Sequence, residues 1–106
     1  MSIAAVKTAG REPREYVLRL FVTGHTQKSL RAVKNVTRLC EQHLLGRYDL
    51  EVVDLYQQPE LAAEHQLVAA PTLVKVLPLP PRRMIGDMSD SGRVLAGLGI
   101  AARGRG

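Results

Sequence analysis

The residues that could do chemistry in this chain are few and widely spaced. Cys40 is the single cysteine, so the chain cannot form an internal disulfide or the Cys-x-x-Cys pair that dithiol redox chemistry requires. The three histidines, His25, His43 and His65, have no cysteine or carboxylate at metal-ligand spacing. We interpret them as surface or helix-capping residues, and the sequence predicts no metal site.

Motifs for enzymatic catalysis are also missing. The Ser, His and Asp residues do not form a nucleophile-elbow signature. Gly92, Gly97 and Gly99 do not have the spacing of a phosphate-binding or dinucleotide-binding loop, and they do not follow a predicted strand. The sequence therefore predicts no catalytic residue and no cofactor, which favours a protein that acts by binding.

The charge of the chain limits what it could bind. The 15 Lys and Arg residues outnumber the 10 Asp and Glu residues, which gives a net charge of +5. Such an excess allows an acidic protein, a nucleic acid or a membrane surface as partner. The strand predicted over 72–77 lacks the aromatic residues of an RNA-binding sheet. We therefore expect no nucleic-acid partner, although a small basic nucleic-acid binder remains an alternative.

Cysteine usage and hydropathy indicate where the protein works. A single cysteine is typical of a reducing compartment. No run of 18 apolar residues could span a membrane, and the N-terminus does not resemble a secretory signal. The sequence predicts a cytoplasmic protein that does not contact a membrane.

The first half of the chain has the pattern of a strand, a helix and a strand. Residues 16–23 are β-branched and aromatic, with Leu18, Leu20 and Val22 on one face. A helix is expected over 27–45, capped by Thr26 and ended by Gly46, and a second strand over 48–55. The apolar stripe of this helix is predicted to contain Leu30, Val33, Cys40 and Leu44, with Val36 beside them. The helical connection favours a parallel pair of strands.

The second half adds a helix, two strands and a final helix. Pro59 suits the first turn of a short helix that ends near His65. Strands are predicted over 72–77 and 82–86, separated by a proline-rich turn, and Ser89 or Asp90 can cap a last helix through Leu98. Residues 1–15 are predicted to be a disordered basic arm, 16–100 the folded domain, and 101–106 a flexible tail.

The predicted order βαβαββα is that of the thioredoxin-like α/β fold. Pro71 stands directly before the third strand, where thioredoxin-like proteins have a cis-proline, although an ordinary trans-proline is also compatible with this position. The redox chemistry is absent, because the loop Gly24–Ser29 contains no cysteine. Cys40 lies deep in the predicted helix and is interpreted as a small core residue.

One family resembles the chain from residue 16 to residue 98. Its most specific part here is Pro71-Thr72-Leu73-x-Lys75-x-Leu77-Pro78 followed by Arg82-Arg83-x-Ile85-Gly86-Asp87. The matching segments read YVLRLFVTGHTQKSLRAV, YDLEVVDLYQQPELA and APTLVKVLPLPPRRMIGDMS. On these residues the chain resembles the KaiB family.

The resemblance implies a non-enzymatic adaptor of a circadian clock. KaiB proteins switch between a homo-oligomeric ground state, a dimer or tetramer, and a thioredoxin-like form that binds the hexameric ATPase KaiC. KaiA and the kinase SasA are further partners that the resemblance implies. Basic positions of the KaiB pattern match Arg31, Lys75, Arg82 and Arg83, which we expect to contact partner proteins. We expect Pro71 and Gly97 to determine the fold.

The composition of the C-terminal half fits the fold change that the resemblance implies. Its last helix carries Gly92 and Gly97, and an interior helical glycine costs roughly 1 kcal/mol relative to alanine. Four prolines stand between residues 71 and 81. An alternative ground-state packing of this half is therefore expected to differ by only a few kcal/mol.

The chain departs from the KaiB pattern in a few places. Phe21 replaces the commoner Tyr and Ala70 the commoner Thr, the N-terminal arm is longer and basic, and the end is basic instead of acidic. These differences leave open whether the protein serves a complete clock with KaiA or a reduced timing or stress system. The alternative interpretation is a redox-inactive thioredoxin-like module that binds another protein, for example in a stress response.

Overall fold

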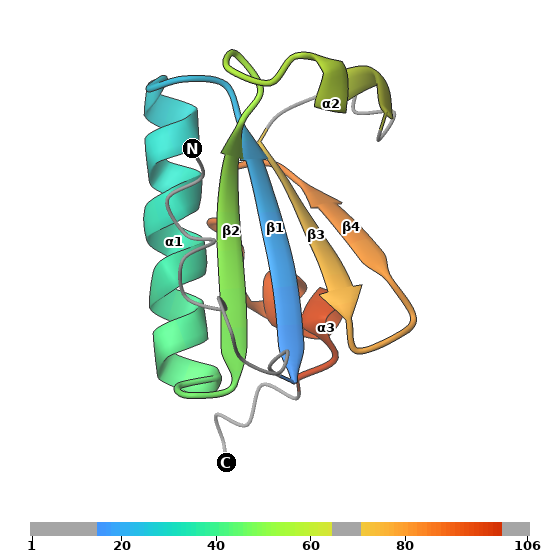
Figure 1. Cartoon of the computed structure of the whole chain (residues 1–106). Coiled ribbons are helices and arrows are strands. Elements are labelled where there is room, and N and C mark those ends of the chain that lie inside the picture. The colour runs from blue at the N-terminus through green and yellow to red at the C-terminus, as the bar shows by residue number, and fades with distance from the viewer. Residues whose placement is uncertain (1–14, 65–70, 101–106) are drawn as a thin grey trace.

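The computed structural model describes residues 15–64 and 71–100, which form a four-stranded sheet and three helices (Figure 1). The strands are β1 (Tyr16–Val22), β2 (Tyr48–Asp54), β3 (Thr72–Leu77) and β4 (Arg82–Ile85), and the helices are α1 (Gln27–His43), α2 (Glu60–Glu64) and α3 (Ser91–Leu98). The strand order is β2-β1-β3-β4. β1 is parallel to β2 and antiparallel to β3, and β3 is antiparallel to β4. The predicted α/β order βαβαββα is confirmed.

The main core lies on the sheet face that α1 and α3 cover (Figure 1). Leu18 and Leu20 of β1 are fully buried there, as the alternation of the strand predicts. Leu73 of β3 and Met84 of β4 extend this core beneath α3. All of these side chains are aliphatic or sulfur-containing, so aliphatic packing carries the stability of the domain.

A smaller cluster occupies the other face of the sheet at the end where α2 lies. Phe21 is 1% exposed and packs with Val53 and Leu55. Leu61 and Ala62 of α2 and Val74 of β3 cover this cluster in part. α2 has five residues, so it covers only one end of this face.

The apolar stripe of α1 differs from the sequence-based prediction. The buried positions are Ser29, Ala32, Val36, Leu39 and Cys40, with Leu44 just after the helix. Leu30 is 52% exposed. The prediction for Leu30 was wrong because the stripe is turned by one position at the start of the helix. There Ser29 faces inward, and its hydroxyl accepts the N–H of Thr23, the residue after β1, at 3.2 Å.

Capping and turn residues shape the C-terminal half, as the sequence predicts. Asp90 caps α3, since its Oδ1 accepts the Arg93 N–H at 3.1 Å. The Leu77–Pro78 and Leu79–Pro80 peptide bonds are cis in the β3–β4 turn. Pro71 is buried, and its carbonyl accepts the Gly86 N–H at 3.0 Å. Four predicted features lie outside the described residues. They are the Ala70–Pro71 bond, the arm up to residue 14, the end of the short helix at His65 and the tail 101–106.

Within residues 15–64 and 71–100, no helix combines the length and the apolar character that crossing a membrane requires. The same residues contain no cluster of three metal-ligating side chains.

Candidate protein-interaction surface

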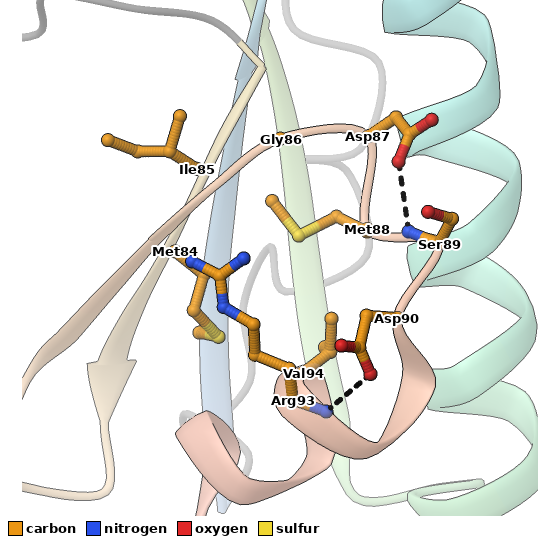
Figure 2. Close-up of a pocket in the computed structure, with 9 residues that line it drawn as sticks. All are labelled: Met84, Ile85, Gly86, Asp87, Met88, Ser89, Asp90, Arg93 and Val94. Carbon is orange, nitrogen blue, oxygen red and sulfur yellow. Dashed lines mark hydrogen bonds between the residues drawn. The ribbon is translucent and has the colours of Figure 1, made fainter.

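The turn between β4 and α3 forms the centre of the candidate site (Figure 2). Gly86 has a φ of +125° and Met88, a non-glycine residue, a φ of +63°. Asp87 Oδ1 accepts the Ser89 N–H at 3.1 Å, and the Met88 side chain is buried. These interactions hold the turn in one shape, with the Asp87 carboxylate directed toward α1 (Figure 2).

Two side chains of α1 contact Asp87. Arg31 Nε lies 3.2 Å from Asp87 Oδ2, and Asn35 Nδ2 donates to the Asp87 carbonyl at 2.9 Å. Hydrogen bonds from Ser89 and then from Arg31 hold the pKa of Asp87 below its usual value. Arg31 therefore joins the N-terminal helix to the C-terminal half, while its side chain remains 55% exposed.

The contact of Asn35 with Asp87 was not predicted. Asn35 follows Arg31 by four positions, which places both side chains on one face of α1. The sequence therefore does indicate that Arg31 and Asn35 lie side by side on the helix. The pairing with Asp87, which is 56 residues away from Arg31, could not be read from this spacing.

Arg82 and Arg83 lie on β4, which is an edge strand of the sheet. Both are exposed. Successive strand residues point to opposite faces, so Arg82, opposite Lys75, is on the α3 side, and Arg83, opposite Val74, is on the other side. The structure therefore places the two guanidinium groups around one edge and not on one flat patch.

Lys75 is buried in this fold, with an exposed fraction of 4%. It is on the same face of β3 as Leu73, and its Nζ lies 3.8 Å from the position that a Cβ on Gly99 would take. Gly99 is the C-cap of α3, and a cation near a helix C-terminus is favourable. Lys75 thus supports α3 here, and its expected contact with a partner stays a prediction.

Gly97 allows α3 to approach β4 closely. A Cβ at this position would clash with the Met84 Sδ and lie 3.2 Å from the Met84 Cγ and Cε atoms. Together with the buried Pro71, Gly97 therefore lies where the C-terminal half packs on the sheet. The role of both residues in determining the fold stays a prediction.

Neither the pocket beside the β4–α3 turn nor Cys40 has the features of a catalytic site. The pocket between β4, the turn and α3 has a volume of about 70 Å³, well below the ~300 Å³ of a small-molecule site (Figure 2). At the start of α1, where thioredoxins hold their dithiol, this chain has Gly24, His25 and Thr26. Burial raises the pKa of the Cys40 thiol to about 12. The thiol is therefore protonated at neutral pH and unsuited to nucleophilic chemistry.

Comparisons with known proteins agree with this description. A family model for the KaiB domain matches residues 19–100. The circadian clock oscillator protein KaiB of Synechococcus sp. (strain RCC307) is 49% identical over 89 residues, which cover 83% of this chain and 81% of that protein.

Solved structures show the same fold. The N-terminal domain of SasA from Synechococcus elongatus superposes with a TM-score of 0.67 at 25% identity, covering 82% of this chain and 86% of that one. Mitochondrial thioredoxin 3 from Saccharomyces cerevisiae gives a TM-score of 0.65 at 16% identity, covering 81% and 78%. The fold is therefore thioredoxin-like.

The sequence match spans most of the chain and most of the Synechococcus relative. The chain therefore belongs to the KaiB family of circadian clock proteins.

Proposed function

We propose that this protein is a non-enzymatic KaiB-type adaptor that binds a KaiC-like hexameric ATPase ring and modulates its phosphorylation and ATPase cycle. The observation that carries the proposal is the exposed region made up of the Arg31–Asp87 contact, the β4–α3 turn and the β4 edge. It contains three of the four basic residues expected at an interface, and two of them, Arg82 and Arg83, are well exposed. Charged side chains at such a rim steer association and select acidic partners.

The likeness to the SasA domain supports the thioredoxin-like form as the binding form. We propose that the free protein is a homo-oligomer, a dimer or tetramer, in an alternative packing of its C-terminal half. KaiA and a SasA-like kinase are further partners in this proposal, and the setting is the cytoplasm. The alternative is a redox-inactive module for another protein, which the superposition with thioredoxin 3 and the absence of cysteines from the β1–α1 loop support.

The test is size-exclusion chromatography with light scattering, with and without a KaiC hexamer and ATP. The expected result is a dimer or tetramer that slowly becomes ring-bound protein. Arg82→Glu is expected to weaken ring binding at least about tenfold, because it opposes an acidic partner surface. Arg47→Glu is the matched control, since Arg47 is exposed just before β2, the edge strand opposite β4, and the change in net charge is the same.

Two results would count against the adaptor. Protein that stays unbound at every nucleotide state and incubation time would favour the redox-inactive module. Equal weakening by Arg82→Glu and Arg47→Glu would show that net charge, and not the β4 surface, governs binding. Circular dichroism of each variant verifies that the fold is intact.

A further inference from the structure

A second and larger pocket lies between α1 and the ends of β1 and β2. Its volume is about 420 Å³, within the ~300–1,000 Å³ of small-molecule sites. α1 runs alongside β2 on this side of the sheet (Figure 1). The pocket is lined by neither the β4–α3 turn nor β4, so it is separate from the proposed interaction surface.

The floor of the pocket is apolar. Leu30 and Val33 contribute from α1, and Val22 and Val52 from the strands. Leu30 is 52% exposed, and Val33 and Val52 are only partly buried. Because the stripe of α1 is turned toward Ser29, Leu30 faces the pocket. Val22 belongs to the main core, and Val33 and Val52 pack against that core and present their remaining surface to the pocket. An apolar ligand would remove this surface from water at about 25 cal/mol per Å².

The rim of the pocket carries polar groups of both signs. Lys34 follows Leu30 by one helical turn, and His25 lies at the opposite end in the β1–α1 loop; both are exposed. The carboxylate of Asp54 is engaged by the protein, since its Oδ1 accepts the N–H groups of Gly24 and Tyr56, each at 2.9 Å. These two backbone hydrogen bonds hold the pKa of Asp54 below its usual value.

From this arrangement we propose that the pocket is a binding site for a small amphipathic anion, a molecule with an aliphatic or aromatic body and one anionic head group. The body lies on Leu30, Val33 and Val52. The head group lies at Lys34, whose ammonium offers three donors on a flexible stem. The Asp54 carboxylate already accepts two backbone hydrogen bonds, so Lys34 is the charged rim residue that is left to contact the head group.

The proposal is tested with the full ¹⁵N-labelled chain and two probes that differ in charge. Sodium decanoate and decyltrimethylammonium are titrated below their micelle-forming concentrations, and amide shifts are followed by NMR. The expected result is saturable shifts at the residues that line the pocket, with decanoate bound at least about fivefold more tightly than the cation. The readout needs no partner protein, so it is independent of the proposed function.

Three variants locate the site. Leu30→Ser is expected to weaken decanoate binding about fivefold through lost apolar contact, and it leaves the fold intact because Leu30 is exposed. Lys34→Gln is expected to weaken decanoate binding about threefold and to leave binding of the cation unchanged. Arg38→Gln removes an exposed α1 cation outside the pocket and is expected to change neither.

Other outcomes would overturn the proposal. Shifts that map to other exposed apolar residues, such as Leu45 or Leu79, would show non-specific adsorption. Equal affinity for the two probes would remove the role of charge. Affinity for decanoate that survives both Leu30→Ser and Lys34→Gln would place the ligand elsewhere.

Discussion

At the scale of single residues, burial decides what Cys40 can do. Its side chain is fully buried in α1 against the main core. Desolvation raises the pKa of the thiol to about 12, with a smaller contribution from the nearby Glu41. A thiolate is the reactive form of cysteine, so this residue acts as a small apolar group of the core.

The thiol is expected to resist alkylation in the native protein. Labelling by iodoacetamide at pH 8 should be at least a hundredfold slower than in urea-unfolded chain, because reaction requires opening of the core. The pKa of the thiol in the folded protein lies above its ordinary value of 9.0. Burial of the protonated thiol therefore contributes stability below pH ~9 that is lost as the pH rises toward 12. Rapid native labelling at pH 8, measured by mass spectrometry, would contradict the burial of Cys40.

At the scale of elements, the start of α1 joins the helix to β1. The Thr26 hydroxyl accepts the Ser29 N–H at 3.1 Å, and the Ser29 hydroxyl accepts the Thr23 N–H at 3.2 Å. Ser29 is 1% exposed, so these hydrogen bonds satisfy polar groups that the core would otherwise leave unpaired. They also set the rotation of α1, which exposes Leu30.

The cap of α1 gives a prediction with a matched control. Thr26→Ala is expected to lower the free energy of unfolding by about 1 kcal/mol, because it removes an N-cap acceptor. Thr37→Ala, at an exposed position inside the same helix, is expected to be neutral or to stabilise by a few tenths of a kcal/mol. Urea denaturation followed by circular dichroism measures both. Equal effects of the two substitutions would show that the cap contributes nothing.

At the scale of the whole molecule, the packing of α3 on β4 holds the C-terminal half in this fold. Gly97 faces Met84, which is 7% exposed in the main core. An alanine at position 97 would gain roughly 1 kcal/mol of helix propensity. It would also press on the Met84 side chain, and overpacking costs about 1–3 kcal/mol.

The two residues are therefore expected to be coupled. Gly97→Ala should be neutral to destabilising in the native background, by up to about 2 kcal/mol. In a Met84→Ala background the same substitution should stabilise by about 1 kcal/mol, since the cavity left by Met84 accepts the new methyl group. A double-mutant cycle from urea unfolding measures the coupling. Additive effects would show that α3 and β4 do not pack as the structure has them.

The sequence by itself determined the order of elements, because strand alternation, the Thr26 and Asp90 caps and the proline-rich turn are local signals. It also determined the family, and it identified Cys40 as a core residue. It could not determine the rotation of α1, because a stripe through Leu30 and Val33 and one through Ala32 and Val36 both have helical spacing, and the docking of the helix on the sheet selects the second.

The tertiary structure decided which basic residues are exposed and which are buried. Lys75 and the β4 arginines look alike in the sequence, yet register places Lys75 at the C-terminal end of α3 and leaves Arg82 and Arg83 at a sheet edge. The contact of Arg31 and Asn35 with Asp87 joins segments that are 52 or more residues apart. Such contacts depend on how helices dock on the sheet, and docking is set by the packing of the whole core, which no local pattern encodes.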